Sequence, residues 1–346
     1  MDPYEPVPGS VDDALLILEP AAPGESPRFE DLQNPAGDDV VTAAAGDRYY
    51  LLLGGRWCSL PRSIDERRFV YQEGFPLARL FRLAVRPLLQ VQMLAHGAAA
   101  LHATAVDIGG RALLVGGWSE SGKTETALAF LEDGARFLSD KWTIVTSDGV
   151  AGAFPISVGI RRWVLPYTPR LRRSLPIAAR VQLTGAGVVA GLARPVRGRR
   201  PAGRLGGVVV GAIDQAVALA ERAALSPSQL RSSYGRATDD GWTAPLGVVA
   251  LLTTIPCGEP VVVGEGSAEW AARRLARAAA FERRGLFDLY ERARYPFPDG
   301  SSRRTETERA DERFLVDVLS ATTILDVRAP FPTDPRTVAK AIRRAL

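Results

Sequence analysis

The segment that most constrains the fold of this chain is residues 117–124, which read G-x-x-x-x-G-K-T. An apolar run at 112–115 precedes it, and apolar residues at helical spacing follow it from 126 to 131. This order of strand, glycine loop and helix is the context in which the motif binds phosphate. The glycines let backbone N–H groups point at phosphate oxygens, and the N-terminus of the helix adds its positive end. The sequence therefore predicts an α/β fold with a phosphate-binding loop.

Two side chains of this loop have specific expected roles. Lys123 is expected to reach the terminal phosphates of a nucleotide, and the Thr124 hydroxyl is expected to bind Mg²⁺. The alternative is a chance match in a glycine-rich turn, but the strand and helix patterns on both sides argue against it. The residues expected to surround the nucleotide are Gly117, Trp118, Ser119, Glu120, Ser121, Gly122, Lys123, Thr124 and Glu125.

The composition is that of an ordinary globular protein, with 346 residues of which 46% are apolar and 24% charged. At roughly 100–200 residues per domain, we expect two units. The formal net charge of +4 does not indicate a nucleic-acid partner. The chain has three lysines, Lys123, Lys141 and Lys340, and two of them lie in or near the phosphate motif.

The sequence shows no sign of export or of a membrane span. The N-terminus lacks a basic region followed by an apolar one, and no apolar run approaches the roughly 18 residues that a span needs. We therefore expect a cytoplasmic protein without a membrane partner. Cys58 and Cys257 are far apart and lack metal-ligand spacing, so we expect both to be reduced, buried thiols.

Hydrophobic patterns divide the chain near residue 74. Residues 1–74 hold strand-like pieces separated by glycines, with a hairpin signal at Gly54-Gly55, and predict a small β-rich unit. Residues 75–346 are expected to form the nucleotide-binding catalytic domain, beginning with a helix that Pro87 should kink or split. Strands are expected at 14–18, 40–42, 49–53, 56–58, 68–71, 98–106, 112–115, 136–140, 142–145, 206–213, 248–255, 261–263 and 324–327, and helices at 75–93, 126–131, 217–224, 226–236, 267–283, 306–319 and 334–346.

Asp140 is the candidate acid of the site. It ends the strand predicted after the loop helix, where a neighbouring strand would deliver a carboxylate to the glycine loop. Such a carboxylate holds Mg²⁺ through water or accepts a proton from a substrate hydroxyl. The alternative is a solvated turn acid. The spacing of Asp140 from Lys123, along strand, loop, helix and strand, favours the functional role.

The second candidate is His102, one of two histidines in the chain, the other being His96. The strand at 98–106 is expected to turn back at 107–110 into the strand that leads to the loop. This hairpin would put His102 beside the phosphates. A structural and a functional role both remain open for it.

Residues 151–205 are expected to be irregular, because they hold six prolines among many arginines. One or two of these guanidinium groups are expected to clamp phosphate or an acidic substrate, and most of the others to face solvent. The arginines concerned are Arg161, Arg162, Arg170, Arg172, Arg173, Arg194, Arg197, Arg199, Arg200 and Arg204.

Parts of the chain resemble the catalytic domain of HPr kinase/phosphorylase, a family that shares its nucleotide-binding core with phosphoenolpyruvate carboxykinase. The similarity lies in L-H-A at 101–103, S-G-K-T-E-T-A-L at 121–128 and G-A-R-F-L-S-D at 134–140. The Glu directly after G-K-T and the R-x-x-x-D strand separate this family from other phosphate-loop proteins. The end of the chain, R-A-P-F-P-T-D-P at 328–335, looks like that of HPr kinase-related proteins found beside peptide-modifying enzymes, including those of lasso peptides.

The resemblance implies a role for each matching position. Lys123 would hold the β- and γ-phosphates, while Thr124 would bind Mg²⁺ with Glu125 close by. Asp140 would be the catalytic base at the metal site, and His102 would lie near the transferred phosphoryl group. The chain departs from HPr kinases at Lys141, directly after Asp140, where HPr kinases carry a second Asp. It also lacks their later glutamate-arginine-glycine signature. HPr itself is therefore not the expected substrate.

The function implied is an ATP- and Mg²⁺-dependent kinase that transfers the γ-phosphate to an acceptor hydroxyl, by analogy a Ser on a peptide or small protein. The corresponding fold is a catalytic domain of the HPr kinase and phosphoenolpyruvate carboxykinase type, preceded by a small β-rich unit. There are two alternatives: a small-metabolite kinase, and a nucleotide-binding regulatory module without transfer activity. Lys141 favours the regulatory module. HPr kinases are hexamers, but a homo-oligomer is left open here because no sequence feature supports one.

Overall fold

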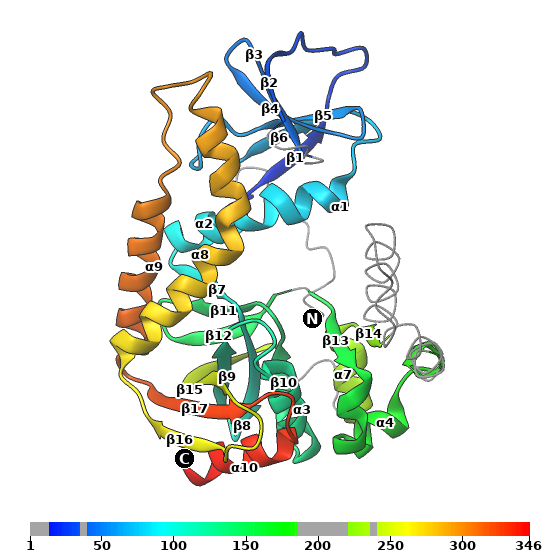
Figure 1. Cartoon of the computed structure of the whole chain (residues 1–346), viewed down its shortest axis with the longest axis vertical. Helices are drawn as coiled ribbons and strands as arrows, with labels where there is room; N and C mark the ends of the chain where they lie inside the picture. Colours follow the sequence, from blue (N-terminus) through cyan, green and yellow to red (C-terminus); the bar gives the residue numbers. More distant parts are fainter. Residues whose placement is uncertain (1–13, 35–39, 155, 184, 186–220, 236–240) are drawn as a thin grey trace, which may run out of the picture. The chain divides into compact units, whose positions relative to one another are not determined.

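The computed structural model describes residues 14–34, 40–154, 156–183, 185, 221–235 and 241–346 (Figure 1). Within these residues the chain is a mixed α/β protein with three sheets, and it divides into two compact units. The N-terminal unit takes the described residues up to Ala100, together with Glu269–Ser320. The glycine-loop unit takes the described residues of Leu101–Ala268 and of Ala321–Leu346. Strand β7 (Ala98–Leu101) carries the chain from the first to the second.

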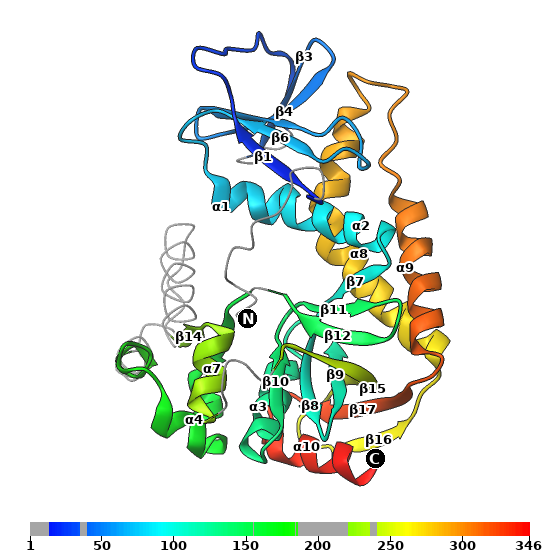
Figure 2. The same cartoon turned by 180° about the vertical axis from the view of Figure 1, so that it is seen from behind.

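The N-terminal unit contains a sheet of short strands, of which β1, β3, β4 and β6 are labelled in Figure 2. The strand order is β1-β6-β5-β4-β3-β2. The strands are β1 (Ile17–Pro20), β2 (Glu30–Gln33), β3 (Val41–Ala45), β4 (Arg48–Leu53), β5 (Arg56–Leu60) and β6 (Arg68–Tyr71). The hairpin expected at Gly54-Gly55 is confirmed, since Leu53 of β4 pairs with Arg56 of β5. Strand β2 is missing from the strands that the sequence predicts, because its residues are mostly exposed and lack the apolar alternation of a half-buried strand.

Helices complete this unit. They are α1 (Leu77–Leu80), the π-helical turn η3 (Phe81–Val85), α2 (Arg86–Ala95), α8 (Ala268–Ala293) and α9 (Arg304–Leu319). The helix expected at 75–93 is thus present, with a wide π turn just before Pro87. Proline has no N–H for the carbonyl one turn earlier, and a widened turn is one way in which a helix accommodates it.

The core of this unit explains why its boundaries differ from the division near residue 74 that the sequence suggests. Phe69 of β6, Leu80 of α1 and Phe287 of α8 lie in one buried hydrophobic cluster. Residues 75–100 and 269–320 therefore group with the N-terminal strands. The sequence pattern does not reveal this, because α8 is almost 200 residues from the strands it packs on.

The glycine-loop unit is built around one large sheet, in which β10, β8, β9, β15, β12 and β11 are neighbours in that order and β17 lies between β15 and β16. Its strands are β8 (Ala103–Ile108), β9 (Arg111–Gly117), β10 (Arg136–Ser139), β11 (Thr143–Thr146), β12 (Val150–Ala153), β15 (Thr243–Ile255), β16 (Val262–Glu265) and β17 (Thr323–Pro330). A two-stranded sheet pairs β13 (Val158–Arg161) with β14 (Arg222–Leu225). The helices are α3 (Lys123–Glu132), the 3₁₀ helix η4 (Arg162–Tyr167), α4 (Pro169–Ser174), α7 (Pro227–Ser233) and α10 (Pro335–Arg344).

Strand directions bring several strand ends to one edge of this sheet. Strands β9, β15 and β17 are parallel, with Leu252 beside Gly117 and Ile255 beside Pro330. Strand β8 is antiparallel to β9 and β10 is antiparallel to β8, so β10 runs in the direction of β9. The last residues of β9, β10 and β17, including Ser139, therefore meet at the same edge. Ligands of α/β sheets bind at such carboxyl ends.

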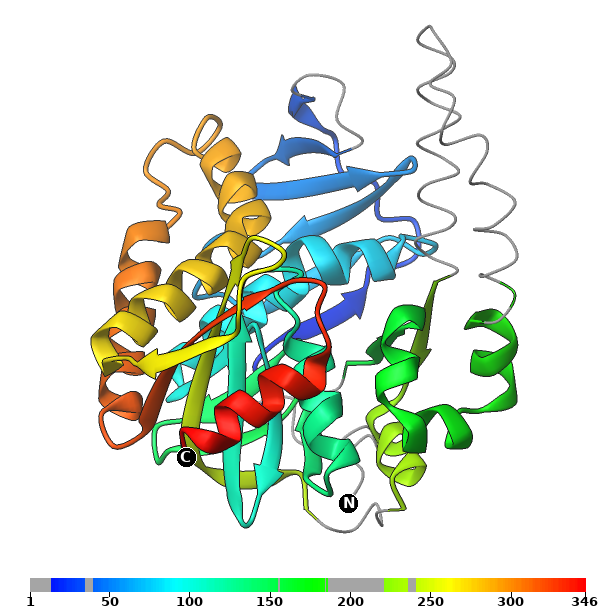
Figure 3. The same cartoon turned by 60° about the horizontal axis from the view of Figure 1, so that its bottom comes forward.

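Helices α3 and α10 cover one face of the sheet (Figure 3, α10 in red). Phe130 of α3 and Ile342 of α10 are fully buried in a cluster with Val115, Leu252 and Val327 of the three parallel strands. This packing fixes the axis of α3, and with it the position of the loop that connects β9 to the helix.

Three sequence expectations about the polar and irregular parts are wrong. The described residues of 151–205, which the sequence predicts to be irregular, include β13, η4 and α4. Residues 222–225 form strand β14, whereas the sequence predicts a helix at 217–224, the first four residues of which lie outside the described part. Cys257 is exposed rather than buried, whereas Cys58 is a buried thiol whose pKa desolvation raises to about 12. The strand expected at 206–213 also lies outside the described residues.

The helix start expected at Ser226 is confirmed. The Ser226 hydroxyl accepts a hydrogen bond from the Gln229 backbone N–H, and the Gln229 side chain accepts one from the Ser226 backbone, which is a complete capping box. No helix in the described part of the chain is long and apolar enough to cross a membrane.

Candidate functional site

The loop from Gly117 to Thr124 turns sharply between β9 and α3 by using the left-handed region of backbone space. Gly117, Glu120 and Gly122 have φ values of +150°, +60° and +92°. A Cβ on Gly117 would lie 2.6 Å from the Ser121 hydroxyl oxygen and 2.8 Å from the carbonyl oxygen of Leu252. The sequence therefore needs glycine at this position for steric as well as conformational reasons.

Substituting this glycine tests how tightly the loop is built. Gly117→Ala is expected to destabilise the chain by more than the roughly 1–3 kcal/mol of a strained φ alone, because its Cβ also overlaps the Ser121 hydroxyl and the backbone carbonyl of Leu252. Gly110→Ala is the matched control: Gly110 has a φ of +89°, and a Cβ there meets nothing within 4 Å. Urea unfolding of both variants measures the difference. Equal losses of stability in Gly117→Ala and Gly110→Ala would show that the loop can accommodate a Cβ at Gly117 without steric overlap.

Lys123 is held inside the loop. Its ammonium group donates to the carbonyl oxygens of Gly117 at 3.0 Å and of Trp118 at 2.6 Å, and the residue is only 7% exposed. The Ser121 hydroxyl donates to the same Trp118 carbonyl at 2.9 Å. The loop therefore curls around the lysine. An ammonium group in this position can exchange loop carbonyls for phosphate oxygens without leaving the loop.

Asp140 lies directly after β10 and reaches the first turn of α3. Its Oδ1 accepts hydrogen bonds from the Thr124 hydroxyl at 2.7 Å and from the Thr104 hydroxyl at 2.6 Å. The residue is 2% exposed, and its Oδ2 has no hydrogen-bond partner among the residues that the structure describes. The expected proximity of Asp140 to the glycine loop is thus observed.

The half-satisfied carboxylate of Asp140 is chemically informative. A buried polar atom without a partner is costly, and such atoms often mark a functional site or a missing ligand. A carboxylate oxygen is an acceptor for a hydroxyl proton and a ligand for a hard cation such as Mg²⁺. The arrangement around Oδ2 therefore fits either a substrate hydroxyl or a metal-bound water.

Sequence reasoning missed Thr104, which holds Asp140 in place. Thr104 lies on β8 and pairs with Val115 of β9, two residues from Gly117. It is two residues beyond His102, so the period of two along a strand beside the loop was the signal that could have identified it.

His102 sits at a bend immediately before β8 and is partly buried. The next residue, Ala103, pairs with Gly116, so His102 flanks the start of the loop as the sequence suggests. The other histidine, His96, follows α2 in the N-terminal unit, where its Nδ1 lies 2.7 Å from the Gln92 carbonyl oxygen. His96 therefore has a local structural partner outside this site.

Glu125, in the first turn of α3, is buried with 8% of its surface exposed. Burial raises the pKa of its carboxyl group above the usual value, and the nearby Asp140 adds to this. Arg161 and Lys123 act in the opposite direction. A carboxyl group with a raised pKa in the folded chain lowers the stability of the protein at neutral pH, because its ionised form is unfavourable there. A bound cation would stabilise the ionised form and remove this loss of stability.

Replacing this carboxyl group tests its cost. Because the pKa of Glu125 is raised in the folded state, the protonated carboxyl group favours folding at low pH. This contribution to the free energy of unfolding is lost as the pH rises above the ordinary pKa of Glu. Glu125→Gln cannot ionise, so we expect it to raise the melting temperature at pH 7 and to flatten this part of the pH dependence. Thermal melts of both proteins between pH 4 and pH 8 measure the effect. A lower melting temperature for the variant at pH 7 would contradict it.

Among the arginines of the expected group that the structure describes, Arg161 contacts the loop. Five others lie outside the described residues: Arg194, Arg197, Arg199, Arg200 and Arg204. Arg161, at the end of β13, donates to the Glu120 carboxylate at 2.7 Å. The Arg161 side chain is about one-third exposed, and the Glu120 side chain is largely exposed. Because this ion pair is accessible to water, it contributes little to stability and is easily exchanged for another anion.

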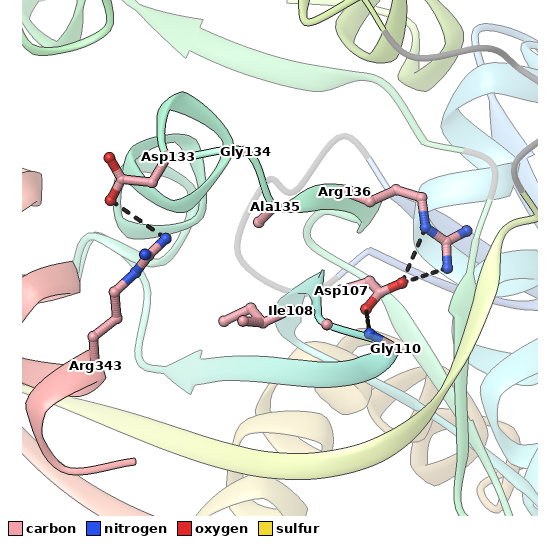
Figure 4. Close-up of a pocket in the computed structure, with 9 residues that line it drawn as sticks. Asp107, Ile108, Gly110, Asp133, Gly134, Ala135, Arg136 and Arg343 are labelled. Atoms are coloured by element: carbon pink, nitrogen blue, oxygen red, sulfur yellow. Dashed lines mark hydrogen bonds and ion pairs between the residues drawn. The ribbon is translucent and has the colours of Figure 1, made fainter.

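A separate cavity of about 600 Å³ lies at the other end of β8, β9 and α3 (Figure 4). Its lining charges are already paired: Arg136 contacts Asp107 at 2.6 Å, and Arg343 contacts Asp133 at 3.4 Å. These residues stand at the turn of the β8–β9 hairpin and at the C-terminal end of α3, away from the glycine loop. We therefore take the loop edge as the candidate site.

The residues able to hold a metal are few. Across the described part of the chain, no three His, Cys, Asp or Glu side chains form a metal cluster. Mg²⁺ that binds with a nucleotide needs only one or two protein oxygens, because phosphates and water supply the others. Thr124 and Asp140 offer those oxygens, with Glu125 on the same turn of α3 as Thr124.

Neither a scan against models of protein families nor a search of curated proteins found a match for this chain. Its function is therefore inferred from the geometry of the site and from the short motifs that it carries.

Proposed function

We propose that the chain is an ATP- and Mg²⁺-dependent phosphotransferase of the HPr kinase-like type, which transfers the γ-phosphate to an acceptor hydroxyl. The single observation that carries this proposal is the contact between Asp140 and the glycine loop. A carboxylate that is 2% exposed accepts a hydrogen bond from the Thr124 hydroxyl of a G-x-x-x-x-G-K-T loop, and its second oxygen remains unsatisfied among the described residues.

The loop residues fit a triphosphate. The backbone from Gly117 to Gly122 curls through three left-handed residues, and Lys123 lies within the curl. Backbone N–H groups and a lysine at the start of a helix are the elements by which phosphate loops bind nucleotides. Thr124, Asp140 and Glu125 are the residues that would hold Mg²⁺, which when bound offsets the charge on the transferred phosphoryl group.

In the proposed transfer step one proton moves to Asp140, and one P–O bond forms while another breaks. The acceptor hydroxyl gives its proton to the Asp140 carboxylate as its oxygen attacks the γ-phosphorus. The bond from that phosphorus to the β–γ bridging oxygen breaks, and ADP leaves with the bonding electrons. Lys123 stabilises the charge that builds up on the phosphate oxygens, and His102 flanks the reacting group. Thr104 orients the base by occupying its other oxygen.

The acceptor proposed is a Ser on a peptide or small protein. It rests on the resemblance of the motifs and of residues 328–335 to HPr kinase-related proteins that accompany peptide-modifying enzymes. A small metabolite with a hydroxyl group would use the same step, and incubation with such compounds in the absence of peptide separates the two.

The direct test is transfer of label from [γ-³²P]ATP to serine-containing peptides by the purified chain. We expect labelled peptide in the presence of Mg²⁺ and none after EDTA treatment, with activity restored by added Mg²⁺. A chain that binds ATP but transfers no phosphate to any acceptor would instead support the regulatory module. Lys141, which follows the proposed base with a φ of +63°, is the observation that favours that second candidate.

Arg161 is expected to strengthen phosphate binding. Because its ion pair with Glu120 is exposed, a triphosphate can draw the guanidinium away at little cost. Arg161→Gln is expected to weaken MgATP binding by about tenfold, the typical loss of a charge-assisted hydrogen bond. Arg162→Gln, a neighbouring and exposed residue, is the matched control and should bind normally. Calorimetric titration measures both, and equal affinities would remove Arg161 from the site.

A further inference from the structure

The glycine loop has an aromatic neighbour on the flank opposite Asp140. Phe331 directly follows β17, and its ring lies against the loop: a Cβ on Gly122 would be 3.3 Å from Cδ2 of Phe331. Gly122 is the last residue before the helix that begins at Lys123. The ring therefore packs beside the phosphate-binding turn.

Further rings continue from Phe331. The Trp163 ring of η4 lies edge-to-face with Phe331, with ring centroids 5.6 Å apart at 74°. Tyr167 stands 6.4 Å beyond Trp163 at 72°. All three side chains are partly exposed rather than buried. Trp163 also packs against the hydrophobic core of this unit. An aromatic row that begins at a phosphate loop and is not fully buried can do more than fill a core.

The position of this row follows from the sheet. Strand β9 separates β8 and β10, which deliver Thr104 and Asp140, from β15 and β17, which deliver Phe331. If Asp140 acts on the γ-phosphate, the phosphate chain starts on the β10 flank. The nucleoside end must then extend away from Asp140, toward the side of β9 on which β15 and β17 lie. Phe331 and Trp163 are aromatic residues on that side.

We propose that Trp163 and Phe331 form the platform for the purine base of the nucleotide: the base stacks on the face of one ring and contacts the edge of the other, because the two rings are inclined at 74°. The proposal rests on the phosphotransferase function above and adds the nucleoside half of its site. A purine presents a flat, apolar face, and stacking on aromatic side chains is the usual way in which proteins bind it without reading its edge. Tyr167 supports the platform from the far side, and Arg336 lies 5.3 Å from the Tyr167 ring centre.

The test compares ligands with and without a base. MgATP and Mg²⁺-tripolyphosphate share the phosphate chain, but only the first can stack. In the wild-type chain we expect MgATP to bind at least about tenfold more tightly than tripolyphosphate, as measured by calorimetry. Trp163→Leu and Phe331→Leu should each remove most of this preference while leaving the affinity for tripolyphosphate unchanged. Trp270→Leu, which changes a partly buried tryptophan of the N-terminal unit, is the control and should keep the preference.

Each outcome separates the platform from the function on which it rests. Equal affinity of the wild-type chain for the two ligands overturns the platform and leaves the phosphate site standing, and this result requires no variant to fold. A preference for ATP that survives both leucine variants also overturns it. A wild-type chain that binds neither ligand overturns the phosphotransferase and the platform together.

Discussion

Asp140→Asn should lower phosphate transfer by at least about 100-fold while leaving MgATP binding within a few-fold of wild type. Asparagine keeps a side-chain oxygen for the Thr104 and Thr124 hydroxyls, so the local packing is retained. What it loses is the charge and basicity at the position of Oδ2. General bases contribute about 10²–10⁴ to a rate, and an amide cannot supply this contribution.

The measurement is single-turnover transfer from [γ-³²P]ATP, with the affinity for MgATP determined in parallel. Asp133→Asn is the control, because Asp133 stands at the opposite end of α3 in an exposed ion pair with Arg343. Near-normal transfer by Asp140→Asn would remove the proposed base. A loss of ATP binding without loss of single-turnover rate would make Asp140 a metal residue only.

Lys123→Ala is expected to reduce both MgATP binding and transfer by at least about 100-fold, because the lysine contributes a charge to the ground state and to the transition state. The residue is 7% exposed, and its ammonium group is already oriented by two loop carbonyls. A preorganised charge of this kind loses little freedom when a phosphate binds. Removing the Lys123 ammonium group therefore loses nearly all of its favourable interaction with the phosphate.

The loop carbonyls complicate this variant, since alanine also removes two hydrogen bonds that hold the curl. Unfolding in urea separates lost stability from lost binding. Lys340→Ala, which changes an exposed lysine on α10, should be indistinguishable from wild type in all three measurements. Unchanged MgATP affinity in a folded Lys123→Ala variant would show that the loop binds something other than a triphosphate.

Local patterns made the centre of this site predictable. The strand, loop and helix around Lys123 are contiguous in sequence, so steric and hydrogen-bonding rules for short segments suffice to place them. Asp140 could be anticipated because only α3, one short turn and β10 separate it from the loop. His102 is placed by a tight hairpin, whose register is fixed by the turn that joins β8 to β9.

Contacts between distant segments were not predictable in this way. Phe331 reaches Gly122 from more than 200 residues away, and only the order of β9, β15 and β17 in the sheet brings them together. The assignment of α8 and α9 to the N-terminal unit is of the same kind. Helix periodicity shows that α8 has an apolar face but not which sheet covers that face. Strand β14 was mistaken for helix because its partner, β13, lies about 60 residues earlier.

Isothermal titration of the wild-type chain with MgATP, repeated with Lys123→Ala, tests most directly whether the turn between β9 and α3 receives a nucleotide's phosphates. We predict saturable binding to a single site in the wild-type chain and its loss in the folded variant. A wild-type chain without affinity for any nucleoside triphosphate, or a variant that binds as tightly as the wild type, would contradict the account.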